Sequence, residues 1–288
     1  MMVTSKPIVV GIGELLWDIF PTGKRAGGAP ANFVYHASAL GAQGIAVSAV
    51  GEDALGREIL TELDSNHISH LCAKVPYPTG TVQVTLHNGQ PSYEIVENVA
   101  WDHIPLTQEG IDILKSADAV CFGSLALRSK ESRQTILSLL DAAPLNALRF
   151  FDVNLRQHYY SKELIEQLLQ KTNIFKINDE ELEVLAQLFH LNGDEHAKCR
   201  TLLDTYHLTY VVLTAGDKYS TIYGTDEMSR METPRVQVAD TVGAGDAFSG
   251  AFVAGLLAGK TLRKAHEQAV ETAAFVCTKT GAWPAYTK

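Results

Sequence analysis

Six short, nearly continuous apolar runs recur along the chain and predict buried strands. They cover residues 7–13, 44–51, 119–125, 148–154, 173–178 and 210–216. Such runs are typical of strands that are covered on both faces. Stretches with helical spacing lie between them, at 31–41, 56–66, 181–189, 244–258 and 261–279. This alternation predicts an α/β fold in which a central, mostly parallel sheet carries helices on both faces.

One region departs from this pattern. Residues 79–96 alternate between apolar and polar positions and contain Asn88-Gly89, a pair that favours a tight hairpin turn. Together with residues 15–23, this pair of strands predicts a small β lid that covers an active site or joins two subunits in a homodimer. No repeat or linker divides the chain, so we expect a single domain over 1–288, with lid segments at about 15–23 and 79–100.

Composition narrows the function classes. The 288 residues are 46% apolar, which favours a well-packed globular protein, and their formal charge is −9 with no basic run, which argues against a nucleic-acid partner. No apolar stretch reaches the length of a membrane span, and the N-terminus lacks the pattern of a secretion signal. We therefore expect a cytoplasmic protein without a membrane partner. The four cysteines are widely spaced, which argues against zinc and disulfides.

The segment 240–252, DTVGAGDAFSGAF, carries the clearest chemical signal. A glycine turn that opens a helix exposes backbone N–H groups, and these groups favour an anion such as phosphate. Asp246 would repel a phosphate, unless it serves as a base that accepts a proton from an attacking hydroxyl. The alternative is that Asp246 only caps the helix.

A second glycine turn, AGGAPANF at 26–33, also opens a predicted helix. The amide of Asn32 and the carboxylate of Asp18 together offer donors and acceptors suited to a polyol. The alternative is that both are solvated loop residues or helix caps.

These segments resemble the two signature regions of the ribokinase/PfkB family of carbohydrate kinases, and GELLWDIFP, GGAPAN and DVNLR are most similar to fructokinases. The resemblance implies a ribokinase-like fold and makes Asp246 the catalytic base. It also implies that the amides of Gly243, Ala244 and Gly245 form an anion hole.

The same resemblance assigns the nucleotide side. Asn178 and Glu181 match a motif that organises the nucleotide phosphates and Mg²⁺, the ion being bound to Glu181 through water. Read without the family, Asn178 is a helix N-cap followed by acidic first-turn residues. Thr214 and Gly216 match a nucleotide-binding strand end, but Tyr219 stands where the family usually has a second glycine.

On the sugar side, Asp18, Gly28 and Asn32 match positions that bind substrate hydroxyls, and Arg156 matches an arginine that faces the substrate or the transferred phosphate. Asp240 resembles part of a monovalent-cation site, which implies activation by K⁺. The alternative for Arg156 is an arginine exposed in a loop.

The expected reaction is therefore transfer of the γ-phosphate of ATP, with Mg²⁺, to a hydroxyl of fructose, giving fructose 6-phosphate. A related alternative is a kinase for 2-keto-3-deoxygluconate or another sugar acid, with Arg156 paired to the carboxylate. Two alternatives of other classes are a non-catalytic sugar-binding protein and a dinucleotide-dependent oxidoreductase. The oxidoreductase is suggested by Gly11-x-Gly13, although Leu16 replaces the third glycine.

Overall fold

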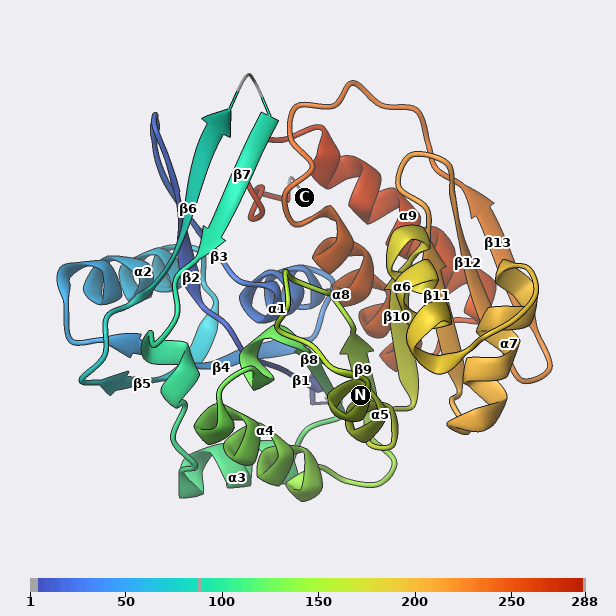
Figure 1. Ribbon diagram of the computed structural model, residues 1–288, viewed down its shortest axis with the longest axis horizontal. Coiled ribbons are helices and arrows are strands. Elements are labelled where there is room, and N and C mark those ends of the chain that lie inside the picture. Colours follow the sequence, from blue (N-terminus) through green and yellow to red (C-terminus); the bar gives the residue numbers. More distant parts are fainter. Residues whose placement is uncertain (1–4, 88–89, 287–288) are drawn as a thin grey trace.

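The computed structural model describes residues 5–87 and 90–286, and its centre is a nine-stranded sheet (Figure 1). In spatial order the strands are β13 (Met228–Glu232), β12 (Tyr219–Gly224), β11 (Tyr210–Thr214), β10 (Ile174–Asn178), β9 (Leu148–Asp152), β8 (Ala119–Gly123), β1 (Ile8–Ile12), β4 (Gln43–Gly51) and β5 (Ser69–Val75). Neighbouring strands are parallel from β11 to β5, whereas β12 and β13 are antiparallel additions. All six predicted strands are present, and the predicted α/β class is confirmed.

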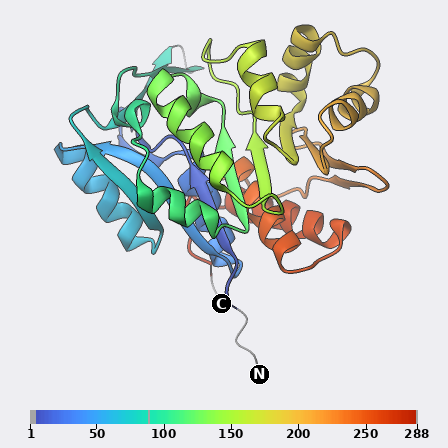
Figure 2. The same ribbon diagram turned by 90° about the horizontal axis from the view of Figure 1, so that it is seen from below.

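Helices cover both faces of this sheet (Figure 2). On one face lie α1 (Ala29–Ala39), α2 (Ala54–Ser65), α8 (Ala244–Leu257) and α9 (Leu262–Cys277). On the other lie α3 (Gln108–Lys115), α4 (Lys130–Ala142), α5 (Lys162–Leu169), α6 (Asp179–Phe189) and α7 (Glu195–Thr205), with the short 3₁₀ turns η1 (Ala100–His103) and η2 (Leu125–Leu127). An apolar core lies on each face of the sheet, and successive strand residues point into alternate cores: Phe151 packs on the second face and Phe150 on the first. This arrangement explains why the strand sequences are apolar throughout.

A second sheet of four strands stands beside the carboxyl ends of the central strands (Figure 1). Its order is β3 (Gly23–Gly27), β2 (Leu16–Phe20), β6 (Gly80–His87) and β7 (Gln90–Ile95). The antiparallel pairing of β6 with β7 confirms the strand pair predicted from the alternating pattern, whereas the Asn88-Gly89 turn itself lies outside the described residues. We call these four strands the small sheet.

The order of elements after β1 bears on the oxidoreductase alternative. The chain passes from β1 directly into β2 and β3, and the first helix begins only at Ala29. A dinucleotide fingerprint requires a helix that opens at the glycine turn, so that its N-terminus meets the pyrophosphate. The turn after Gly11-x-Gly13 has no such helix, and the oxidoreductase interpretation is therefore wrong.

Candidate active site

Asp246 and Asn32 come from two helices that begin side by side. Asp246 lies in the first turn of α8, Asn32 in the first turn of α1, and the Asn32 amide Nδ2 donates to Asp246 Oδ2 at 2.7 Å. The helices approach closely because α8 carries small residues: a Cβ on Gly250 would lie 2.5 Å from the carbonyl oxygen of Phe33. The two predicted segments, more than 200 residues apart in the chain, thus form one site.

The surroundings of Asp246 suit a group that must accept a proton. Loss of water around the carboxyl and the nearby Asp152 raise its pKa to about 6, while the Asn32 hydrogen bond, Lys176 and Arg156 act in the opposite direction. A base with this pKa is ionised near neutral pH and still has appreciable affinity for a proton.

The glycine turn before α8 has the geometry of an anion site. Gly243 is the N-cap with φ of 77°, a left-handed conformation that favours glycine. The Ala244 N–H donates to the Thr241 carbonyl at 3.2 Å, whereas the N–H groups of Gly245 and Asp246 bond to no other residue in the described part of the chain. Of the three amides predicted to form an anion hole, those of Gly243, Ala244 and Gly245, the amide of Ala244 is engaged in the turn.

A buried ion pair that the sequence analysis did not assign supports this turn from below. Lys176 on β10 and Asp152 on β9 are register partners, and Nζ lies 2.6 Å from Oδ2, with side chains only 9% and 10% exposed. Burial alone would lower the pKa of Lys176, but Asp152 together with Glu181 and Asp246 outweighs burial, so the pKa of Lys176 is raised. A Cβ on Gly245 would lie 3.5 Å from Lys176 Nζ, so this positive charge lies directly beneath the turn.

The predicted sugar-binding residues lie around the same centre. Asp18 is on β2 and Gly28 is the N-cap of α1. Burial raises the pKa of Asp18, against the opposing effects of Arg156 and Arg25. Arg156 is exposed, as its loop alternative predicted, yet its charge acts on Asp18, Asp246 and Glu14.

Glu14, absent from the prediction, is a further acid of the site. Its carboxyl is buried, one oxygen accepts from the Ala29 N–H at 3.3 Å, and the other has no hydrogen-bond partner in the described structure. Burial raises its pKa to about 7.

The predicted nucleotide residues lie at the carboxyl ends of adjacent strands. Asn178 ends β10, Thr214 ends β11, and the two are register partners. Asn178 Oδ1 accepts from the Glu181 N–H at 2.8 Å and Glu181 Oε2 accepts from the Asn178 N–H at 3.0 Å, which confirms the helix-cap interpretation. Gly216 follows in the turn after β11, where its carbonyl accepts from Thr233 Oγ1.

The side chains of Glu181 and Tyr219 both have partners within the protein. Glu181 Oε1 also accepts from the Leu155 N–H at 2.9 Å, so both carboxyl oxygens hold backbone amides. Each oxygen keeps a lone pair that can bind a metal-bound water, which fits the predicted indirect contact with Mg²⁺. The Tyr219 hydroxyl donates to Glu195 at 2.6 Å, and the Arg230 guanidinium lies 3.5 Å from the centre of the Tyr219 ring.

Asp240 connects the small sheet to the glycine turn. Its Oδ2 lies 2.6 Å from Arg25 Nη1 on β3 and accepts from the Gly281 N–H, and its Oδ1 accepts from the Val242 N–H. The predicted cation ligand is therefore engaged by an arginine and two amides.

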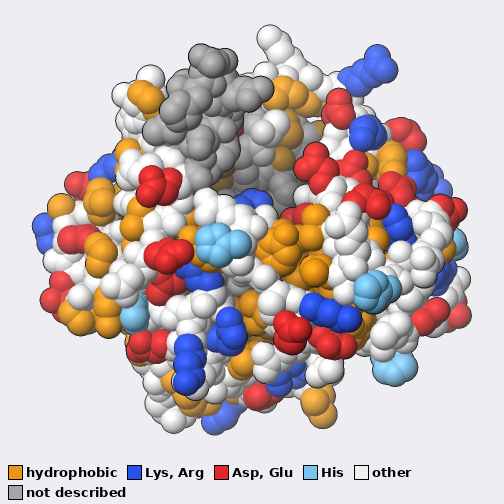
Figure 3. Space-filling model, viewed as in Figure 1, with side chains coloured by type: hydrophobic (Ala, Val, Ile, Leu, Met, Phe, Trp, Pro, Cys, Tyr) orange, Lys and Arg blue, Asp and Glu red, His pale blue; other side chains and the backbone are white. Residues whose placement is uncertain are grey.

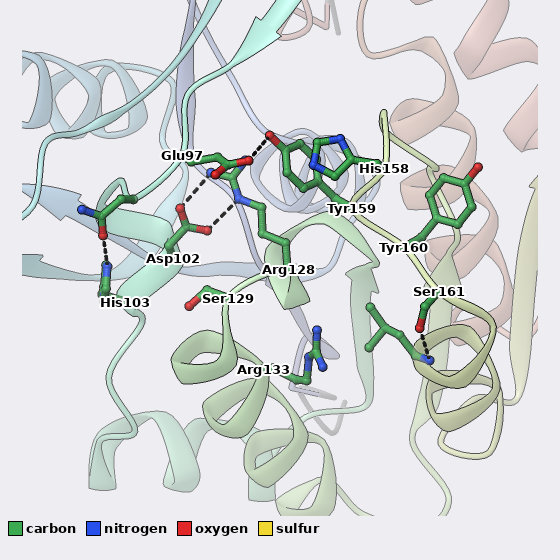
Figure 4. Close-up of a pocket in the computed structure, with 12 residues that line it drawn as sticks. Glu97, Asp102, His103, Arg128, Ser129, Arg133, His158, Tyr159, Tyr160 and Ser161 are labelled. Atoms are coloured by element: carbon green, nitrogen blue, oxygen red, sulfur yellow. Dashed lines mark hydrogen bonds and ion pairs between the residues drawn. The ribbon is translucent and has the colours of Figure 1, made fainter.

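A separate hollow of about 490 Å³ lies between η1 and the first turns of α4 and α5 (Figure 4). Its centre is Arg128, which makes two hydrogen bonds of 2.8 Å to Asp102 and lies 3.9 Å from the centre of the Trp101 ring and 4.8 Å from that of Tyr159. These contacts anchor the segment after β7. Trp101 thus packs against Arg128, and the predicted site residues lie elsewhere.

The surface carries no dominant charge on the face that Figure 3 shows: basic and acidic side chains are interspersed.

No three His, Cys, Asp or Glu side chains gather as a metal cluster within residues 5–87 and 90–286. Across the same residues, every helix is too short or too polar to cross a membrane.

Comparison with known proteins decides the family. The family model "pfkB family carbohydrate kinase" matches residues 13–287. The chain belongs to the pfkB family of carbohydrate kinases. An ATP-dependent 6-phosphofructokinase of Thermoanaerobacterium thermosaccharolyticum is 29% identical, with 95% of this chain and 89% of that protein covered. A fructokinase of Rhizobium leguminosarum bv. trifolii is 27% identical, with 89% and 82% covered.

A solved relative shows the same architecture. A sugar kinase of Pyrococcus horikoshii in complex with ATP is 27% identical, covers 96% of this chain and 94% of its own, and superposes with a TM-score of 0.80. The present chain is thus a pfkB sugar kinase, an enzyme with the ribokinase-like fold that the resemblance implied.

Proposed function

We propose that this pfkB kinase transfers the γ-phosphate of ATP to a hydroxyl of fructose, giving fructose 6-phosphate, with Asp246 as the base. One observation carries the proposal: an acid held by a neutral amide lies at the opening of α8, beside backbone N–H groups that have no partner among residues 5–87 and 90–286. This pairing brings a proton acceptor and an anion site within one helical turn.

The roles of the residues follow from this geometry. Asp246 accepts the proton of the attacking hydroxyl while the new O–P bond forms and the bond to the leaving diphosphate breaks. The amides of Gly243 and Gly245, with the charge of Lys176 below, offset negative charge on the phosphoryl group, and the Ala244 N–H joins them only by leaving the Thr241 carbonyl. The small sheet excludes water, and Asp18, Gly28 and Asn32 hold the sugar hydroxyls.

ATP as the donor is supported by the relative in complex with ATP. Asn178, Thr214 and Gly216 would contact the nucleotide, and Glu181 would hold Mg²⁺ through water. When bound, Mg²⁺ offsets the charge of the phosphates.

A K⁺ ion at Asp240 requires Arg25 to move, since that arginine now pairs with the carboxylate. Turnover in KCl against tetramethylammonium chloride tests this cation: equal rates would contradict it.

Charge around Arg156 favours a neutral sugar over a sugar acid or a sugar phosphate. Its positive charge acts on three nearby carboxyls, those of Glu14, Asp18 and Asp246. An anionic substrate would have to compete with these acids for one arginine and would be repelled by each of them that is ionised. A neutral polyol meets no such repulsion, and its hydroxyls can hydrogen-bond to each of the three carboxyls.

A substrate panel tests the proposal. ADP release is measured with fructose, fructose 6-phosphate and 2-keto-3-deoxygluconate, and the product is assigned by NMR. We expect fructose to give the highest kcat/KM, with phosphate on the 6-hydroxyl. A value at least tenfold higher for the sugar acid or the sugar phosphate would overturn the choice of fructose, and no ADP release with any sugar would overturn the kinase reaction itself.

We also propose that the small sheet joins two copies of the chain. The strands β3 and β7 end this sheet on either side, and each leaves one edge without a partner strand in the described chain. Light scattering coupled to size exclusion should give twice the mass of the chain at micromolar concentration. The mass of one chain would contradict this assembly.

A further inference from the structure

The segment after α9 folds back along α1. The Tyr35 hydroxyl donates to the Pro284 carbonyl at 2.7 Å, and His36 lies within hydrogen-bond distance of the Ala282 carbonyl and of the Tyr286 hydroxyl. This segment also fits tightly against the glycine turn, because a Cβ on Gly243 would lie 2.7 Å from that of Ala282. The end of the described chain is thus part of the wall of the site.

Trp283 makes the contact that matters for the chemistry. Its indole Nε1–H donates to Asn32 Oδ1 at 2.8 Å, while Asn32 Nδ2 donates to Asp246 Oδ2 at 2.7 Å. An indole nitrogen can only donate a hydrogen bond, so it requires the amide oxygen on its own side. The opposite rotation of the Asn32 amide would set two donors against each other. The tryptophan therefore determines which end of the amide faces Asp246.

We propose that Trp283 is a positioning residue that holds the Asn32 amide with its N–H toward Asp246 and so favours the ionised form of that base. The inference rests on the proposed function of Asp246. An ionised carboxylate accepts from the amide N–H, whereas a protonated carboxyl gains most by donating to the amide oxygen. With Trp283 in place only the first arrangement is available; without it the amide can rotate and stabilise the protonated acid. Removal of the indole N–H therefore raises the pKa of Asp246.

The other groups around Asp246 stay unchanged when Trp283 is replaced. Those that affect its charge come from four places, the strands β9 and β10, the loop after β9 and the turn after β1: they are Asp152, Lys176, Arg156 and Glu14. None of them hydrogen-bonds to Trp283 in the described structure. A change in titration can thus be assigned to the amide.

The experiment compares the wild type with two variants that lack the donor. Trp283→Phe keeps an aromatic ring, and β-(3-benzothienyl)alanine at position 283 keeps the bicyclic shape with sulfur in place of N–H. We expect the acidic limb of kcat/KM against pH to move upward by about one pH unit in both, and the plateau at high pH to stay within about threefold of the wild type. A merely structural role would lower the plateau without moving the limb.

Tyr35→Phe is the matched control. It removes another hydrogen bond between α1 and the same segment but leaves the Asn32 amide untouched, so its limb should stay at the wild-type pH. An equal shift in Tyr35→Phe, or no shift in either Trp283 variant, would overturn the inference.

A second readout separates this inference from the proposed function. The ¹⁵N resonance of the Asn32 side-chain amide should titrate with Asp246, and its midpoint should be higher in Trp283→Phe. This measurement needs no turnover. If the midpoint moves but Asp246→Asn remains active, the proposed base is wrong and the positioning contact stands. If the midpoint does not move, the inference fails whatever the activity.

Discussion

Two acids at the floor of the site, Asp152 and Asp246, have opposite partners. Asp152 lies 2.6 Å from the ammonium of Lys176, and Asp246 lies 2.7 Å from the neutral amide of Asn32. A carboxylate that is paired with a buried cation is needed to balance that cation's charge. A carboxylate that is held by an amide is kept in place and can still take a proton. The difference supports a charge-balancing role for Asp152 and is consistent with the base proposed at Asp246.

Of the substitutions that test this comparison of Asp152 with Asp246, the one at Asp246 should have the largest effect, and that effect is on turnover. Asp246→Asn keeps the shape and removes the proton acceptor, so we expect kcat to fall about 10³-fold, or about 4 kcal/mol in the activation barrier. Measured by ADP release, with circular dichroism and fructose binding as checks on the fold, a loss of less than tenfold would remove Asp246 from this role.

The ion pair beneath the turn should show the next largest effect, on stability. Lys176→Met leaves Asp152 buried without its cation, which should lower the free energy of unfolding by about 3–5 kcal/mol in urea titrations. Lys171→Met is the control, since its partner Asp141 has a side chain that is 65% exposed, and the pair should contribute less than about 1 kcal/mol. Equal effects would show that the buried pair contributes no more to stability than the pair at the surface.

A smaller effect is expected from the turn itself. Gly243→Ala meets both a left-handed backbone and the Cβ of Ala282, whereas Gly259→Ala has φ of 74° and open space around it. We expect about 1–2 kcal/mol of destabilisation for Gly259→Ala and about 3 kcal/mol for Gly243→Ala. Thermal unfolding measures both. If the two variants were equally stable, the close contact with the C-terminal segment would contribute nothing.

The sequence predicts the central sheet well, because strands such as Ile8–Ile12 are buried on both faces and read as apolar runs. It misses β5, β12 and β13, which lie toward the edges and mix polar with apolar residues, as Ser69–Val75 and Met228–Glu232 show. Tertiary contacts decide these strands, and local pattern does not.

Some residues of the candidate site can likewise be predicted from the sequence, and others cannot. The glycine turns that place Asp246 and Asn32 have a local signature in the sequence. Lys176 left a weaker signal, as a lone charge within an apolar strand, which requires a buried partner. Trp283 left none, because its contact with Asn32 joins residues 251 positions apart and depends on how the end of the chain folds back.

The pH dependence of kcat/KM for fructose tests the central claim most directly. Asp246 must be ionised to accept a proton, so activity should be full above its pKa and fall about tenfold per pH unit below about pH 6. Glu14, whose pKa is raised to about 7, is the nearby acid that could imitate this limb, and Glu14→Gln removes it. The account predicts a limb near pH 6 in both the wild type and Glu14→Gln. A flat profile between pH 5 and 8, or loss of the limb in Glu14→Gln, would contradict it.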